Sequence, residues 1–413
     1  MYVFKRDGTK VLFDPNKIVK AINKAMISVD GALYETDTAE EIADIIGSSA
    51  NGRDLTVEQI QDSVERYLMK SERPDVAKAY ILYREQRNKE RNLHSKIVQS
   101  VIKRNDATAI ENANANVDEK SFSGREKEAS ADVQKIIALD YVLSHEVSEA
   151  HKNMLLYQHD LEKTNIGMHN CLQIDFNKLF TEGFTTRNGD VRPPSKLDTA
   201  CQQMAVIFQC QSQVQFGGVG TIHADYDLAP FVKKSFRKHM ENYFTDVEGL
   251  TEEDAKLVIK AKYEPCEIDN EEIKNTQAYK FAIRQLEREG IQAGEAMYHN
   301  LNTLESRAGS QVPFTSINFG RDTSPEGRFV SEKMLRASLS GIGKHHLTPI
   351  FPISIFQYKQ GCNANPEDPN YDLKQLAIES LSKRIYPNFV NCDYSQAHED
   401  PNNPDTFFST MGK

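Results

Sequence analysis

The sequence predicts an α/β protein in two parts, a mostly helical N-terminal unit with a small β element and a larger α/β domain after it. Over residues 1 to about 93, apolar residues recur at helical spacing between clear start and stop signals. From residue 131 onward, short apolar stretches alternate with helical segments, which is typical of an α/β domain. The 413 residues, 39% of them hydrophobic, suffice for two or three domains with sizeable cores.

The N-terminal unit begins with two short predicted strands within residues 1–13, joined by a turn at Asp7-Gly8. Asp14 is then the expected N-cap of a helix, and Pro15 its first residue, because proline lacks the N–H that this position leaves unpaired. The apolar residues that give this helix its period are Ile18, Ala21, Ile22 and Ala25.

Three more helices are expected in this unit. The second covers roughly 38–49 and ends before Asn51-Gly52. The third runs to about Met69 and opens at Thr56-x-x-Gln59, a capping box in which each side chain bonds the other residue's backbone N–H. The fourth follows Arg73-Pro74-Asp75 and extends to about residue 102.

The second domain is assigned to residues 94–413 and the first to residues 1–93. Residues 104–130 are polar, and their composition alone is typical of a linker. A long amphipathic helix is expected over about 131–151. The clearest strand segments further along are QVPFTSINFG and TPIFPISIFQ.

Composition narrows the class of protein. The net charge is −10 and no basic block stands out, so polymeric nucleic acid is not an expected partner. The N-terminus has no apolar signal region and no window approaches the roughly 18 apolar residues of a membrane span. None of the six cysteines forms a C-x-x-C pair, so no metal site is expected. We therefore expect a cytoplasmic protein with reduced thiols and no membrane partner.

Basic residues gather at the start of the chain. Lys5 and Arg6 lie on the predicted hairpin, and Lys17 lies near a helix start whose N–H groups add partial positive charge. Arginine offers a bidentate fork and lysine a point charge, so the three side chains suit a triphosphate. A basic pair beside a turn is also a common solvated feature, so these residues alone leave both interpretations open.

The whole N-terminal unit resembles the ATP-cone. The resemblance rests on V-x-K-R-D-G, F-D-x-x-K-I, T-V-E near residue 56 and A-x-A-Y-I-x-Y-R-x-x-R at 77–87. In that family the cone binds ATP or dATP and sets overall activity. The resemblance implies that Val3, Lys5, Arg6 and Lys17 hold the nucleotide, with Thr56 near the adenine. A repressor of reductase genes also carries a cone, but with a short zinc ribbon that this sequence lacks.

Most of the remaining chain resembles the large subunit of class III anaerobic ribonucleotide reductases. Four segments carry this resemblance: ENANANVDEKSFSGREKEAS, YQHDLEKTNIGMHNC, QVQFGGVGTIHADYDLAPF and EDPNYDLKQLAIESLSKRIYPNF. The resemblance implies the first part of a ten-stranded α/β barrel of the glycyl-radical reductase type. It also implies that the polar stretch before residue 130 belongs to the ordered core region rather than to a linker.

The family's chemistry is the removal of the ribose 2′-hydroxyl from ribonucleoside triphosphates by radicals. A cysteine thiyl radical takes the 3′-hydrogen, a second cysteine on the opposite sugar face delivers hydrogen, and formate supplies the electrons. Cys171 falls where the family carries this second cysteine, although a lone cysteine before an apolar run is usually a buried small residue. His159, Asp160 and Met411 are candidates for the substrate pocket; a His-Asp pair is as often structural.

Two other features are weaker. Gly217-Gly218-x-Gly220 resembles a phosphate-binding loop, but tight packing is the better interpretation of glycines here. Lys238 lies where the resemblance places the specificity-effector site and the dimer interface, and it is otherwise a single exposed lysine. The other cysteines have no matching role in the family.

The sequence departs from the family at its end. Met411 and Gly412 match the two residues before the thiyl cysteine of the finger loop, and Lys413 stands in the position of that cysteine. The resemblance therefore implies that the glycyl radical and the zinc site belong to a complementary C-terminal half, and that this chain alone does not reduce nucleotides. It also implies a homodimer and a radical-SAM activating protein as partners. One half of a reductase and a nucleotide-binding fragment without catalysis both remain open.

Overall fold

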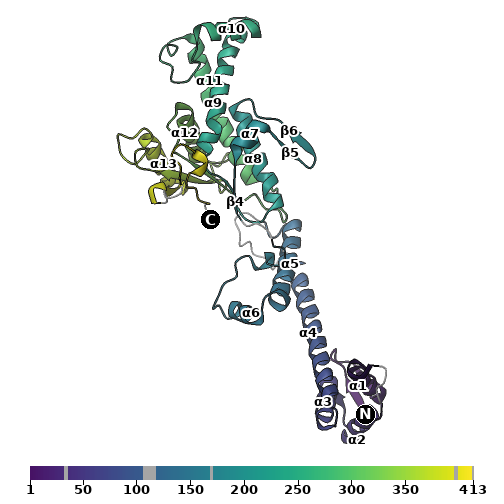
Figure 1. Ribbon diagram of the computed structural model, residues 1–413. Coiled ribbons are helices and arrows are strands. Elements are labelled where there is room, and N and C mark those ends of the chain that lie inside the picture. Colours follow the sequence, from purple (N-terminus) through teal and green to yellow (C-terminus); the bar gives the residue numbers. More distant parts are fainter. Residues whose placement is uncertain (32–35, 106–117, 168–170, 395–398, 412–413) are drawn as a thin grey trace. The chain divides into compact units, whose positions relative to one another are not determined.

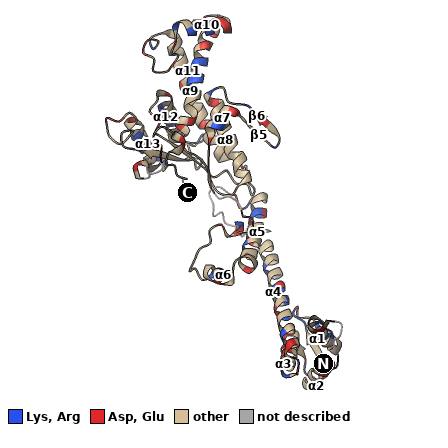
Figure 2. Ribbon diagram, in the orientation of Figure 1, with Lys and Arg blue, Asp and Glu red and all other residues tan. Residues whose placement is uncertain are grey.

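The structure is a computed structural model that describes residues 1–31, 36–105, 118–167, 171–394 and 399–411 (Figure 1). It divides into two compact units, Met1–Ile102 and Lys103–Lys413. The first part of the quoted segment at 111–130, residues 168–170, and the finger-loop position at Lys413 lie outside the described residues. Charged residues of both signs are interspersed along the ribbon (Figure 2).

The first unit has a three-stranded sheet of order β2-β1-β3. Strand β1 (Tyr2–Phe4) pairs antiparallel with β2 (Lys10–Leu12) and parallel with β3 (Leu55–Thr56). The helices of this unit are α1 (Pro15–Asp30), α2 (Asp37–Ser49), α3 (Val57–Lys70) and α4 (Pro74–Asn105). One apolar cluster joins them; its buried residues include Ile22, Met26, Ile46, Leu68 and Tyr80.

The predicted start signals in this unit are confirmed. Asp14 caps α1 by accepting the N–H of Asn16, and Thr56 and Gln59 form the reciprocal capping box of α3. Gly8 in the hairpin turn has φ +83°, a conformation that favours glycine. Strand β3 was not predicted, because two residues are too short to show a period. Helix α4 is continuous across residue 93, where the sequence suggests a domain boundary.

The predicted helix over 131–151 is wrong. The chain instead forms α5 (Phe122–Ile137), a π-helical turn (Ala138–Val142) and α6 (His145–Lys152). Ser144 separates them, because its backbone is extended and its hydroxyl accepts the N–H of Val147 as the N-cap of α6. Apolar spacing alone did not reveal this new helix start.

The second unit is built on a five-stranded sheet of order β10-β9-β8-β7-β4, in which all pairings are parallel. The strands are β4 (Leu172–Ile174), β7 (Val219–Thr221), β8 (Thr315–Phe319), β9 (Ile353–Tyr358) and β10 (Asn388–Asn391). The two segments predicted as strands become β8 and β9. All five residues of β8 are buried, and Ile317, Phe319 and Phe356 belong to the apolar core of this unit.

Helices connect these parallel strands, as parallel pairing requires. The larger ones are α8 (Leu197–Val214), α9 (Ala224–Asn242), α11 (Gln277–Thr303), α12 (Pro325–Ser340) and α13 (Tyr371–Arg384). The smaller elements are α7 (Phe176–Glu182), the hairpin β5 (Phe184–Thr186) and β6 (Gly189–Val191), and α10 (Glu252–Lys262). The sequence thus gives a mixed α/β fold with a parallel sheet.

The second face of this sheet carries polar side chains that hold the segment 399–411. Asn318 donates to the carbonyl of Thr410 at 2.9 Å and accepts its N–H at 3.3 Å. Gln357 donates to the carbonyl of Phe408 at 3.0 Å. Because these polar groups bond backbone, they fix the path of the segment across β8 and β9.

Candidate functional site

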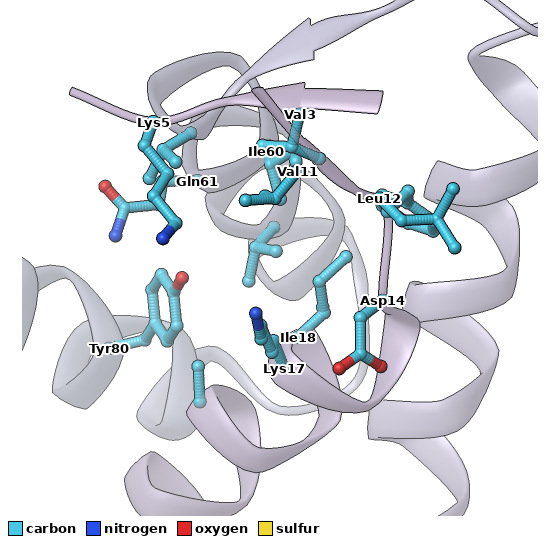
Figure 3. A pocket seen from close by; sticks show the side chains of 14 residues that line it. Val3, Lys5, Val11, Leu12, Asp14, Lys17, Ile18, Ile60, Gln61 and Tyr80 are labelled. Atoms are coloured by element: carbon cyan, nitrogen blue, oxygen red, sulfur yellow. The ribbon is translucent and has the colours of Figure 1, made fainter. Parts of the chain in front are cut away.

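The first unit contains a cavity of about 210 Å³ between its sheet and its helices. Of the predicted nucleotide contacts, Val3, Lys5 and Lys17 line it, and Figure 3 shows both lysine side chains directed into one space. The other residues that line it are Val11, Leu12, Phe13, Asp14, Ile18, Ala21, Val57, Ile60, Gln61, Val64 and Tyr80.

The two lysines of this cavity, Lys5 and Lys17, form no direct ion pair within the described residues, although the Asp14 carboxylate also lines the cavity. The neighbouring Lys10, by contrast, lies 2.7 Å from Asp54. Both side chains are exposed at the cavity. An apolar wall with two unpaired ammonium groups suits a ligand with a flat apolar part and an anionic part.

Arg6 and Thr56, also predicted as nucleotide contacts, do not line this cavity. Arg6 pairs with Glu58 at 2.5 Å and donates to Gln61 at 2.8 Å. Glu58 also accepts a hydrogen bond from the Arg84 guanidinium, with Nη2 and Oε2 2.7 Å apart. This hydrogen bond is the main reason that the pKa of Glu58 is lowered. Arg6 therefore has to leave Glu58 to reach a ligand.

Sequence reasoning missed two polar groups of the cavity, Gln61 and Tyr80. Figure 3 shows the amide of Gln61 beside Lys5 and the ring of Tyr80 facing the same space. Tyr80 is 4% exposed, and burial raises its pKa to about 12, so its hydroxyl remains a donor at neutral pH. In the A-x-A-Y-I-x-Y pattern of the sequence, Tyr80 is interpreted only as a core aromatic residue.

In the second unit, Cys171 and Met411 both lie beside Gly218. The N–H of Gly218 points at the Sγ of Cys171 at 3.4 Å, and Cys171 is exposed. A Cβ added to Gly218 would lie 2.8 Å from the Cε of Met411. At Gly220 a Cβ would lie 2.5 Å from the Oε1 of Gln173 and 2.9 Å from the Sδ of Met411. The packing interpretation is therefore confirmed for Gly218 and Gly220, whereas Gly217 has φ +98°, a conformation that favours glycine.

His159 and Asp160 form a local pair, with Nδ1 and Oδ2 2.5 Å apart. The His159 side chain is 66% exposed, and Asp160 has φ +52°. Neither residue contacts Cys171 or Met411 in any described interaction. Lys238 is half exposed on α9 and lies 3.4 Å from Glu241. Roles for these three residues remain predictions.

Charged groups anchor the segment that ends at Met411. Arg321 and Glu399, both almost fully buried, are joined by two bonds of 3.0 and 3.2 Å. Burial alone raises the pKa of Glu399, but the hydrogen bonds from Arg321 and from the N–H of Phe408 outweigh it and lower the pKa. The guanidinium of Arg321 also lies 3.6 Å from the centre of the Phe407 ring.

A buried histidine makes a second anchor. His223 Nε2 lies 3.1 Å from Asp405, and its Nδ1 lies 3.4 Å from Asp227. Burial alone lowers the pKa of His223, but Asp227 and Asp225 outweigh burial and raise it to about 9. Protonated His223 therefore bridges α9 to the segment at neutral pH.

Four other cysteines, Cys201, Cys266, Cys362 and Cys392, are buried, and burial raises the pKa of each thiol. The described residues contain no cluster of three or more His, Cys, Asp or Glu side chains suited to a metal ion. No helix in the described ranges is long and apolar enough to cross a membrane.

Comparison with known families assigns both units. Residues 1–89 match the ATP cone domain, and residues 113–412 match the family described as anaerobic ribonucleoside-triphosphate reductase. The second match covers most of the chain.

Individual relatives agree. The anaerobic ribonucleoside-triphosphate reductases of Haemophilus influenzae and Escherichia coli are each 32% identical over 402 and 398 residues, which is 95% of this chain and 52% and 51% of theirs. The chain thus spans about half the length of these curated relatives. A solved anaerobic ribonucleotide reductase from Thermotoga maritima, in complex with dATP and CTP, is similar over 76% of this chain and 51% of its own, with 16% identity and a TM-score of 0.45. On the family match and these identities, the chain belongs to the anaerobic ribonucleoside-triphosphate reductases and carries an ATP-cone.

Proposed function

We propose that the first unit binds ATP or dATP as an allosteric effector in the cavity lined by Lys5 and Lys17. The observation that carries this proposal is the pair of lysines that line one cavity beside an apolar wall and that, among the described residues, form no ion pair. The adenine takes the apolar part, near Val3 and Tyr80, and the phosphates take the lysines. Arg6 joins them by exchanging Glu58 for a phosphate, and Thr56 contributes through the start of α3.

Calorimetric titration of the 413-residue chain with ATP and with dATP tests this assignment. Lys5→Ala/Lys17→Ala removes two charge-assisted contacts and is expected to weaken binding about a hundredfold. Lys20→Ala/Lys24→Ala removes the same charge from exposed positions of α1 outside the cavity and is expected to bind like the parent. Equal affinity of the parent and the Lys5/Lys17 variant would refute the site.

We also propose that the second unit supplies part of the active site for formate-dependent reduction of ribonucleoside triphosphates in the cytoplasm. Formate is oxidised to CO₂, the 2′-hydroxyl leaves as water, and Cys171 delivers hydrogen to one face of the sugar. The thiyl cysteine, the glycyl radical and the zinc site come from a complementary C-terminal half, activated by a radical-SAM protein. The assembled enzyme is a homodimer, with Lys238 near the effector site.

The convergence of Cys171 and Met411 at Gly218 supports the catalytic proposal. Cys171 is the exposed thiol, whereas the four cysteines named above are buried with raised pKa values. A hydrogen donor has to reach the ligand, so exposure and position both favour Cys171. His159 and Asp160 are proposed to border the substrate from the neighbouring loop.

An anaerobic assay with formate, the activating enzyme and its cofactor tests the reaction. The chain alone is expected to form no deoxynucleotide, and addition of the complementary half is expected to restore turnover. Cys171→Ala should abolish that turnover, whereas Cys210→Ala, in α8, should retain it. If the reconstituted enzyme keeps full turnover without Cys171, the hydrogen donor lies elsewhere. If reconstitution fails while ATP still binds, the chain is a nucleotide-binding module, a function that the self-contained cavity of the first unit favours.

A further inference from the structure

One face of the five-stranded sheet carries amides at positions where a buried parallel sheet usually carries apolar side chains. Asn318 of β8 pairs with Ile355 of β9, so Asn318 and Gln357 lie on the same face, because side chains alternate along a strand. Both side chains are fully buried. A buried amide is costly unless it is hydrogen-bonded, so the groups that these two amides bond indicate their role.

Asn318 joins the end of β7 to the segment 399–411. Its Nδ2 donates to the carbonyl of Thr221 at 2.8 Å and to the carbonyl of Thr410 at 2.9 Å. Its Oδ1 accepts the N–H of Thr410 at 3.3 Å. The side chain therefore bonds both backbone groups of Thr410, as a neighbouring strand would. From β4, the Nε2 of Gln173 also donates to the Thr410 carbonyl, at 3.4 Å.

Gln357 makes the equivalent link two residues earlier in the segment. Its Nε2 donates to the carbonyl of Ile222, directly after β7, at 3.1 Å and to the carbonyl of Phe408 at 3.0 Å. A side-chain amide nitrogen has two N–H groups, and in both residues both groups are in use. Neither amide can therefore follow a shifted segment without giving up its bond at the end of β7.

The spacing of these bonds fixes where Met411 lies. The two carbonyls that accept from the amides belong to Phe408 and Thr410, and Met411 follows directly. Met411 occupies the space that side chains at Gly218 and Gly220 would need. A shift of the segment by one residue would break the bonds to both carbonyls and move Met411 away from these glycines.

We propose that Asn318 and Gln357 are positioning residues for the reaction, because together they set which residue of the segment 399–411 lies beside Gly218. Gly218 in turn directs its N–H at the Cys171 thiol, so the same bonds set the distance between Met411 and Cys171. The register rests on the contacts alone, whereas its importance for the reaction rests on the proposed catalytic function.

Methionine oxidation tests the register in the 413-residue chain. With dilute hydrogen peroxide, read by peptide mass spectrometry, Asn318→Ala/Gln357→Ala is expected to oxidise Met411 several-fold faster than the parent. Met154, 83% exposed, is the fast internal reference. Met204, 0% exposed, reports unfolding of the unit, because it is oxidised only when the core opens. An unchanged Met411 rate in the folded variant overturns the proposal.

Two further variants complete this test. Asn302→Ala is the matched control, because it removes an amide that bonds the backbone just before β9 and is expected to keep the parent rate. If the double variant oxidises Met204, Thr410→Pro decides the question instead. It removes the N–H that Asn318 accepts and leaves the sheet intact, and it should also accelerate oxidation of Met411.

A urea titration separates positioning from a purely structural role. A purely structural role would lower the unfolding midpoint and leave the Met411 rate of the native protein unchanged, and this result also overturns the proposal. In the reconstituted enzyme, Asn318→Ala should lower kcat at least about tenfold and change KM for the ribonucleoside triphosphate by less than about twofold.

Unchanged kcat together with faster oxidation of Met411 overturns the link between the register and the reaction. Absence of turnover in the reconstituted parent refutes the proposed catalytic function and leaves the oxidation result standing, so the two failures are distinguishable.

Discussion

Removal of Glu399 is the sharpest test of how the segment 399–411 is held. Arg321 and Glu399 have side chains that are 5% and 6% exposed, and Glu399 also accepts the N–H of Phe408 at 2.6 Å. In Glu399→Ala, the guanidinium of Arg321 stays buried over Phe407 without its carboxylate partner. Lys359 loses a partner too, since its Nζ lies 3.6 Å from Glu399.

An uncompensated buried charge of this kind costs about 3–5 kcal/mol. The segment 399–411 is also held by Asn318 and His223. We therefore expect Glu399→Ala to loosen the segment first and to lower the free energy of unfolding of the whole unit as well. Glu399→Gln keeps an oxygen acceptor but loses the charge and should cost about half as much. Arg321→Met/Glu399→Leu removes both charges and should cost less than Glu399→Ala.

Urea denaturation of the full chain and hydrogen exchange over residues 399–411 measure the two effects. Glu379→Ala, which breaks an exposed pair with Lys383, is the matched control and should leave the midpoint unchanged. The reasoning fails if Glu399→Ala costs less than about 1 kcal/mol, or if the double variant is the least stable of the three.

Three further predictions follow from the described contacts. The pKa of His223 is raised from 6.5 to about 9, so its charge stabilises the unit by about 3 kcal/mol, fully below about pH 6.5, and this contribution is lost as the pH rises through 9. In His223→Gln, the urea midpoint should therefore vary less with pH over this range than in the parent. An unchanged dependence of the midpoint on pH would contradict this prediction. Thr56→Ala should lower the stability of α3 by about 1 kcal/mol, measured by amide exchange, while Thr56→Ser should keep the cap; equal exchange in the two variants would exclude a capping role. Gly220→Ala should cost about 1–3 kcal/mol, because its methyl would overlap Gln173 and Met411; unchanged exchange at residues 407–411 would show that the segment does not rest on this strand.

The start signals of the first unit were readable from the sequence because they are local. Asp14, Thr56 and Gln59 bond backbone groups within three residues of themselves, so a short stretch of sequence contains both partners. The nucleotide cavity was only partly predictable for the same reason. Lys5 and Lys17 were identified by motif. That Arg6 points away from the cavity depends on its bond to Glu58, which lies 52 residues away in the sequence.

In the second unit, the strands β8 and β9 and the membership of the reductase family were predictable from the sequence. The helix break at Ser144 was not. The sequence by itself determined the α/β class, the helix caps, the two motif-bearing units and the candidate thiol Cys171. Only the tertiary structure placed Met411 beside Gly218 and brought Asn318 and Gln357 to the segment that carries it. These contacts join residues from tens to nearly two hundred positions apart, and parallel strands linked by helices bring such residues together without leaving any periodic trace in the sequence.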